Sequence, residues 1–106
     1  MLIIFKFYQL SIKLQGFIIR QPYSGQIVNG TKKQEFRNFK TTKLNHPVYL
    51  LSEGFVLGKI MFTGIKDNTK EWKYAWSVKV LKKFTKPWRY AHPLGAQRWV
   101  KEVNRK

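Results

Sequence analysis

Hydrophobic and polar residues alternate along much of this chain with the two-residue period of β-strands. Residues 10–14 alternate strictly, and residues 17–20 form a short apolar run. Two further apolar stretches, 47–51 and 55–65, are separated by Ser, Glu and Gly at 52–54, a composition typical of a hairpin turn. The pattern therefore predicts a β-hairpin preceded by short strands.

The middle and second half of the chain add further strand candidates. Residues 31–39 form one candidate, and another follows the polar segment after residue 65. The residues that share one face of this later strand are Tyr74, Trp76, Val78 and Val80. Gly58 and Gly64 interrupt the stretch 55–65 and predict a bend or bulge there. Five or six strands in a chain of this length are the inventory of a small β-barrel.

One segment departs from the strand pattern. Residues 22–30 begin with Pro22, which suits the first turn of a helix, and end with Asn29 and Gly30, which are helix stop signals. The segment predicts a helix of about two turns, and it contains no Lys or Arg. We expect a mainly β fold with short helices, in the α+β class.

Length and charge define the class of protein. The 106 residues include 21 Lys and Arg but five Asp and Glu, which gives a formal net charge of +16. Hydrophobic residues still make up 43% and aromatic residues 16%, so the chain is not a disordered basic tail. The length allows one domain and excludes a multidomain enzyme. Because self-repulsion at this charge opposes folding, we expect a polyanionic partner, with nucleic acid favoured over a membrane surface.

Other residue types exclude several kinds of site. The chain has no cysteine, hence no disulfide and no thiolate metal site, and its two histidines, His46 and His92, lie far apart. We expect neither a metal nor a cofactor. The apolar start has lysines at 6 and 13, lacks the pattern of a signal peptide, and no stretch reaches the about 18 apolar residues of a membrane span. The sequence predicts a soluble, cytoplasmic protein.

Basic residues are concentrated in residues 32–43 and 66–89, where aromatic residues are interleaved with them. Lysines neutralise phosphates and aromatic rings stack on exposed bases, so this composition favours nucleic acid. The more ordinary interpretation is that most of the aromatic rings are buried in the core and most of the lysines lie on the solvent-exposed surface. A membrane-binding protein would need a basic amphipathic helix, and a reader of duplex DNA would need a basic recognition helix. Residues 22–30 supply neither, which favours RNA over DNA.

A compact polar motif follows the predicted helix, with the pattern Gly30-x-Lys32-x-x-Glu35-x-Arg37. In a strand, Glu35 and Arg37 lie on the same face, and Lys32 stands at its entrance, so two cations are expected around one carboxylate. Gly30 allows the reversal that aims them. Lys32 and Arg37 would bind a phosphate or a base edge, with Glu35 orienting them. The alternative is a structural surface ion pair.

Residues 17–40 resemble the ASCH domain of the PUA-like superfamily. The resemblance rests on Gln21-Pro22-Tyr23, the short helix and the motif of residues 30–37, with Lys86-Pro87, Gly95 and Trp99 towards the end of the chain. It covers residues 14–103 and implies a small PUA-like β-barrel whose cleft handles RNA or a modified base. Residues 1–13 would then be an extension or edge strand, and residues 104–106 a frayed tail.

Three hypotheses remain open. The first is an RNA-binding domain that holds RNA or one unpaired base in a basic cleft; its expected contacts are Lys32, Glu35, Arg37, Tyr23, Trp76, Lys33 and Lys40. The second is a hydrolase acting on RNA or a modified nucleoside, as in some ASCH members, with Lys32 and Glu35 as catalytic residues. One hydrolytic branch of the family has a threonine where this chain has Glu35. The third is a scaffold within a ribonucleoprotein.

Overall fold

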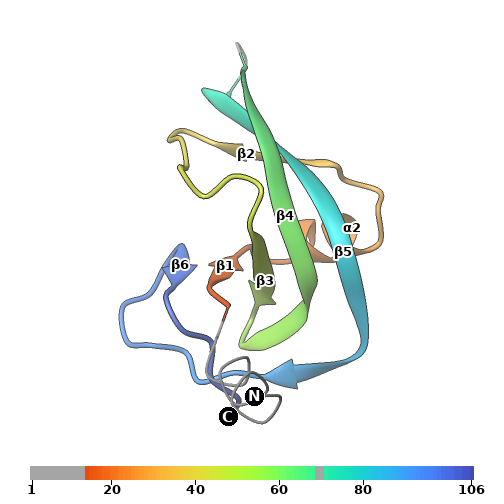
Figure 1. Cartoon of the computed structure of the whole chain (residues 1–106), viewed down its shortest axis with the longest axis vertical. Coiled ribbons are helices and arrows are strands. Elements are labelled where there is room, and N and C mark those ends of the chain that lie inside the picture. The colour runs from red at the N-terminus through yellow and green to blue at the C-terminus, as the bar shows by residue number, and fades with distance from the viewer. Residues whose placement is uncertain (1–13, 69–70) are drawn as a thin grey trace, which may run out of the picture.

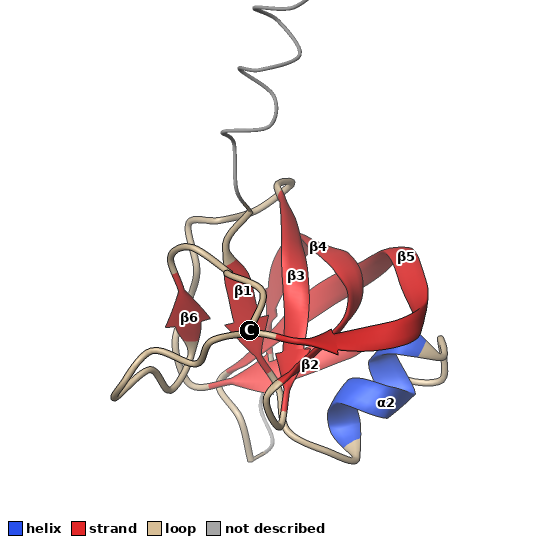
Figure 2. Ribbon diagram, turned by 90° about the horizontal axis from the view of Figure 1, so that it is seen from below, coloured by secondary structure: helices blue, strands red, loops and turns tan. Residues whose placement is uncertain are grey.

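A single six-stranded sheet forms most of the structure, a computed structural model that describes residues 14–68 and 71–106 (Figure 1). The strands are β1 (Gly16–Ile18), β2 (Gln34–Arg37), β3 (Pro47–Ser52), β4 (Phe55–Asp67), β5 (Tyr74–Arg89) and β6 (Trp99–Val100). Their order across the sheet is β2-β5-β4-β3-β1-β6, and every neighbouring pair except the parallel β1 and β3 is antiparallel. The sheet curls into a half-barrel (Figure 2), which confirms the mainly β prediction.

The single helix of the described residues, α2 (Tyr23–Val28), lies within the predicted segment 22–30 and packs against β3, β4 and β5. Two predicted strands are shorter in the structure, since β1 ends at Ile18 and β2 covers 34–37 of the predicted 31–39. In contrast, β5 continues well past Val80 to Arg89. The prediction for residues 10–14 falls almost entirely on residues 10–13, which lie outside the described part of the chain.

The hairpin between β3 and β4 follows from its turn residues. Glu53 and Gly54 both have positive φ, 52° and 87°, as a two-residue turn of type I′ requires. The pairing of β4 with β5 shifts register at Val56/Gly58, Lys59/Ile60 and Phe62/Gly64, and the first and last of these shifts confirm the irregularities predicted at Gly58 and Gly64. At Gly58 the backbones approach so closely that a Cβ would collide with the carbonyl oxygen of Lys82. The glycine therefore allows β4 and β5 to cross closely while the sheet curls.

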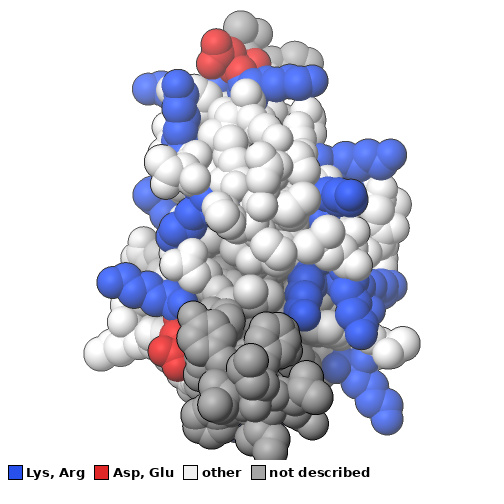
Figure 3. All heavy atoms as spheres, viewed as in Figure 1, with Lys and Arg blue, Asp and Glu red and all other residues white. Residues whose placement is uncertain are grey.

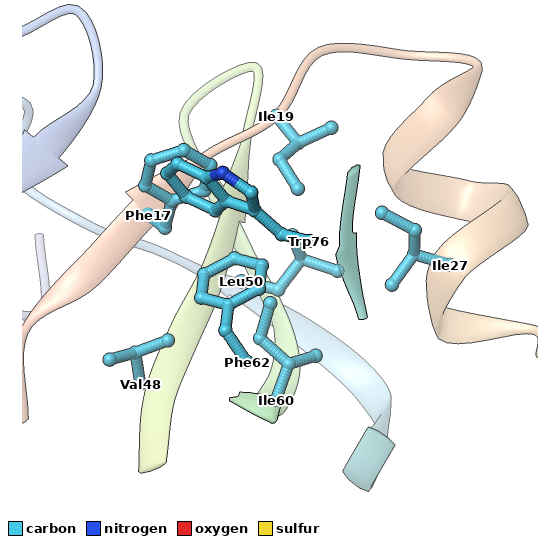
Figure 4. Packing of buried hydrophobic residues seen from close by; sticks show 8 residues of the cluster. All are labelled: Phe17, Ile19, Ile27, Val48, Leu50, Ile60, Phe62 and Trp76. Carbon is cyan, nitrogen blue, oxygen red and sulfur yellow. The ribbon is translucent and has the colours of Figure 1, made fainter. Parts of the chain in front are cut away.

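Buried side chains form two clusters. The larger one lies inside the curl and joins α2 to the sheet (Figure 4); its members are Phe17, Ile19, Ile27, Val48, Leu50, Ile60, Phe62 and Trp76. The rings of Phe62 and Trp76 meet edge to face at 5.0 Å. A smaller cluster consists of Leu51, Val56, Tyr90, Val100 and Val103. This second cluster packs the C-terminal segment against the β3–β4 hairpin.

The C-terminus is paired with the end of β5, so the prediction of a frayed tail at residues 104–106 is wrong. The backbone NH of Ala91 donates to the carbonyl of Asn104 at 2.8 Å, and the NH of Lys106 donates to the carbonyl of Arg89 at 3.0 Å. Arg105 forms a β-bridge with Tyr90 between these bonds. Local sequence gives no sign of this pairing, because it depends on where β5 ends.

Candidate nucleic-acid interface

The segment between α2 and β2 is turned sharply by a set of hydrogen bonds to one carbonyl. The backbone NH groups of Thr31 and Lys32 donate to the carbonyl of Gln26 at 2.9 and 3.0 Å, and the Thr31 hydroxyl donates to it as well, at 3.0 Å. Gly30 has φ of 83°, the left-handed conformation that ends many helices. The glycine therefore makes the reversal predicted for it, and Lys32 is brought to the entrance of β2.

Glu35 and Arg37 form a short ion pair on β2. The Nη2 atom of Arg37 lies 2.6 Å from Oε2 of Glu35, and its Nε donates to the same oxygen at 2.8 Å. Nη2 also donates to the carbonyl of Ile18 at 3.3 Å, which links β2 to the end of β1 across the curl of the sheet. Glu35 is buried, at 6% exposure. The pair is thus more enclosed than a surface ion pair, and removing Arg37 would leave the carboxylate of Glu35 buried without its partner.

Lys32 does not complete the predicted cluster of two cations around one carboxylate. Among the described residues, the ion pair of Glu35 is with Arg37, whereas the ammonium of Lys32 lies 4.4 Å from the ring centre of Phe36 and 5.6 Å from that of Tyr23. Successive residues of a strand point to opposite faces, so the Phe36 side chain leaves β2 on the other face from Glu35. The ammonium of Lys32 lies over the Phe36 ring and not beside the Glu35 carboxylate, which is why the predicted cluster does not form.

These residues line a cleft with a volume of about 570 Å³. Its walls come from the segment after β1, from α2, from β2 and the residue Lys32 before it, and from residues 68, 71 and 72 between β4 and β5. The lining residues are Ile19, Arg20, Tyr23, Lys32, Glu35, Phe36, Arg37, Asn68, Glu71 and Trp72. Tyr23 and Trp72 are exposed, at 49% and 42%. The cleft therefore combines accessible aromatic rings with three cations and two carboxylates.

The structure brings together four of the seven predicted contact residues: Tyr23, Lys32, Glu35 and Arg37. Lys33 does not line the cleft but lines a neighbouring depression that it shares with Lys32. Lys40 is exposed outside the cleft, with its ammonium 5.3 Å from the ring centre of Tyr74.

The prediction that Trp76 contacts the nucleic acid is wrong. Its side chain is completely buried in the larger cluster, and its indole NH donates to the carbonyl of Phe39 at 3.1 Å. It cannot stack on a ligand without unfolding the core, so its aromatic character in the sequence reflected packing.

Trp72 and Arg20 line the cleft although sequence reasoning did not select them. Trp72 had a usable signal, since it is a large aromatic residue between Glu71 and Lys73 in a polar segment, where no alternation explains it. Arg20 lies two residues after the end of β1, and no local pattern in the sequence indicated its role. Both belong to segments that approach β2 only after the sheet has curled.

Two global properties of the described residues are also relevant. No group of three or more His, Asp or Glu side chains in residues 14–68 and 71–106 is arranged to hold a metal ion. In the same residues, no helix has the length and hydrophobicity to cross a membrane.

Neither a protein-family model nor a curated protein sequence matches this chain significantly. The resemblance to the ASCH domain thus stays a prediction from its motifs.

Proposed function

We propose that this chain binds single-stranded nucleic acid, RNA in preference to DNA, and that the cleft receives one unpaired base. The observation that carries the proposal is that Tyr23, Trp72 and Lys32 line one cleft together with the Glu35–Arg37 pair. Exposed rings offer stacking surfaces to any base, and cations beside them attract its phosphate. A volume of about 570 Å³ is large enough for a small ligand such as a nucleotide.

The Glu35–Arg37 pair supplies the polar groups that would orient a base. Carboxylates accept hydrogen bonds from the amino group of cytosine, and guanidinium groups donate to the acceptor edge of guanine. Because each partner already fixes the other, these groups are positioned before a ligand arrives, which lowers the entropic cost of binding. The pair thus has one role in the fold and a second at the bottom of the proposed base site.

The short length of α2 and its lack of basic residues favour RNA over duplex DNA as the ligand. The helix is six residues long and carries no Lys or Arg, so it is unsuited to a DNA major groove. Aromatic stacking requires bases that are not already paired, which is common in RNA loops and single strands. Lys and Arg side chains project from both margins of the face drawn in Figure 3, and they would attract any polyanion.

The test is fluorescence anisotropy with a panel of short single-stranded RNAs of about four nucleotides. The variant Trp72→Ala should weaken binding by about 5- to 150-fold, the equivalent of roughly 1–3 kcal/mol for one stacked base. Tyr23→Ala should act in the same direction. Leu94→Ala is the matched control, because Leu94 is a fully exposed apolar side chain that does not line the cleft.

Two results would contradict the proposal. One is equal affinity of the native chain, Trp72→Ala and Leu94→Ala for every RNA of the panel. The other is cleavage of the RNA by the native chain that Lys32→Ala abolishes, which would replace base binding with the hydrolase alternative. Tighter binding of DNA versions of the same oligonucleotides would overturn the preference for RNA.

A further inference from the structure

A second group of aromatic and basic residues lies outside the cleft. We define the basic-aromatic face by its six members: Tyr49, Lys59, Lys82, Phe84, Trp88 and Arg105. The rings of Tyr49 and Trp88 meet edge to face at 5.6 Å, and Phe84 lies 6.3 Å from Tyr49 and 6.5 Å from Trp88. These rings pack on the margin of the smaller buried cluster. None of the six residues lines the cleft.

The sheet register places two lysines of this face side by side. Tyr49 on β3 is the cross-strand partner of Lys59 on β4, and Lys59 is the partner of Lys82 on β5. Directly opposed residues point to the same face of a sheet, so Lys59 and Lys82 are neighbours in one row. Like charges in this position destabilise a sheet. A bound polyanion would remove that cost.

The surrounding residues of β5 are also basic. Between Lys79 and Arg89 the strand carries five cations and no acid. This concentration is higher than in the cleft, where Glu35 and Glu71 partly offset the cations. A surface of this kind attracts phosphates without selecting a base.

Each ring of the face has a cation close to it. The ammonium of Lys59 lies 6.0 Å from the ring centre of Tyr49, that of Lys82 lies 6.0 Å from Phe84, and the guanidinium of Arg105 lies 4.3 Å from Trp88. These cation–π contacts restrict long side chains that would otherwise be free in solvent. Arg105 is placed there by the pairing of the C-terminus with β5. Three charges from distant parts of the sequence are thus held over one surface.

We propose that the basic-aromatic face binds the sugar-phosphate backbone of single-stranded RNA, independently of the base held in the cleft. The inference takes its ligand class from the proposed function and adds a second, sequence-blind contact region to it. A membrane fits the face less well, because its rings are half-buried. Of the exposed large hydrophobic residues of the described chain, β4 and β5 contribute Phe55 and Leu81, and Phe55 is covered by the guanidinium of Arg89 at 5.4 Å.

The test compares the salt dependence of binding to a single-stranded RNA of about 16 nucleotides, long enough for both regions. For single strands, the slope of log affinity against log salt changes by about 0.7 for each phosphate contact. The double variant Lys82→Gln/Arg105→Gln should therefore make the slope shallower by about 1.4. The matched control is Lys66→Gln/Lys73→Gln, which removes the same charge from exposed lysines outside the cleft and the basic-aromatic face.

A charge-preserving variant protects the test against loss of folding. Lys82→Arg/Arg105→Lys keeps both charges and should keep the slope of the native chain, whereas equal slopes for the glutamine variant and its control would overturn the proposal. The experiments distinguish a failure of the proposed base binding in the cleft from a failure of the proposed phosphate binding on the basic-aromatic face. Trp72→Ala without effect contradicts base binding alone, since the slope change of Lys82→Gln/Arg105→Gln does not depend on it.

The membrane outcome is tested with vesicles of phosphatidylcholine and phosphatidylserine. We expect the double variant to change RNA binding, and we expect no vesicle binding that depends on Lys82 and Arg105. Vesicle binding that the double variant abolishes, together with an unchanged RNA slope, would assign the face to an anionic lipid surface instead.

Discussion

The cleft and the basic-aromatic face use positive charge in different ways. In the cleft, the cations lie among carboxylates and rings, and Arg37 is committed to Glu35 and to the carbonyl of Ile18. On the basic-aromatic face, Lys59 and Lys82 are cross-strand neighbours of the same sign, and the β5 segment around Lys82 contains no acid. The contrast teaches that a net charge of +16 contains two kinds of cation. Arg37 belongs to the first kind and is held by partners within the fold, whereas Lys59 and Lys82 belong to the second kind and stand opposite a like charge.

Removing the cation that pairs with Glu35 in the cleft should have the largest effect on stability. Arg37→Gln leaves the buried carboxylate of Glu35 without its partner, so we expect a loss of roughly 3 kcal/mol in the free energy of unfolding. Urea denaturation measures it. Lys40→Gln removes the same charge from an exposed side chain and should change stability by less than about 0.5 kcal/mol.

A double variant separates the buried charge from general damage. Glu35→Gln/Arg37→Gln removes the unpaired carboxylate and should recover part of the stability lost in Arg37→Gln. A loss in Arg37→Gln no larger than that in Lys40→Gln would mean that the ion pair behaves as an ordinary surface pair.

The next effect concerns Tyr90, in the buried cluster on which the basic-aromatic face packs. His92 donates from Nε2 to the carbonyl of Ala96 at 2.9 Å, which leaves Nδ1 to accept from the Tyr90 hydroxyl at 2.8 Å. Burial raises the pKa of Tyr90 above its ordinary value of 10.0. Above pH 10.0 the unfolded chain therefore loses this proton before the folded chain does, and stability falls as the pH rises through the folded pKa.

Tyr90→Phe should remove this alkaline dependence and cost about 0.5–1.5 kcal/mol at neutral pH through the lost hydrogen bond. Thermal unfolding over a series of pH values measures both. Tyr23→Phe is the matched control, because Tyr23 is exposed in the cleft. Identical pH profiles for Tyr90→Phe and the native chain would contradict the assignment to Tyr90.

Removing one of the two opposed lysines on the basic-aromatic face should have the smallest effect on stability. Lys82→Gln relieves the repulsion from Lys59 and should raise stability by roughly 0.2–1 kcal/mol at low salt. High salt should remove the gain by screening. Lys66→Gln is the control, since the cross-strand partner of Lys66 is Ala75. A loss of stability in Lys82→Gln at low salt would show that the opposed lysines do not repel.

Local sequence predicted the parts of the fold that depend on local chemistry. The helix lies within 22–30, the hairpin turn is at Glu53 and Gly54, and the strand irregularities fall at Gly58 and Gly64. In each case a proline, a glycine or a strict alternation restricts the backbone directly.

The misses depend on distant contacts. Residues 82–89, with adjacent lysines and Pro87, lack the pattern of a strand, yet Lys82, Lys83, Trp88 and Arg89 pair with β4 on either side of a register shift. Pairing of the C-terminus also required the end of β5 to be known. The burial of Trp76 follows from the core that closes around it. The Glu35–Arg37 pair was predictable from a two-residue spacing, whereas Arg20 and Trp72 reach the cleft through the curl of the sheet.

The most direct measurement is the affinity for one single-stranded RNA of about 16 nucleotides over a range of salt concentrations, for Trp72→Ala and Lys82→Gln/Arg105→Gln side by side. We predict that Trp72→Ala lowers the affinity by the same factor at every salt concentration, because stacking carries no net charge. The double variant should instead give a slope shallower by about 1.4. No change in either quantity, or the same change in both variants, would contradict the division between a base-binding cleft and a phosphate-binding face.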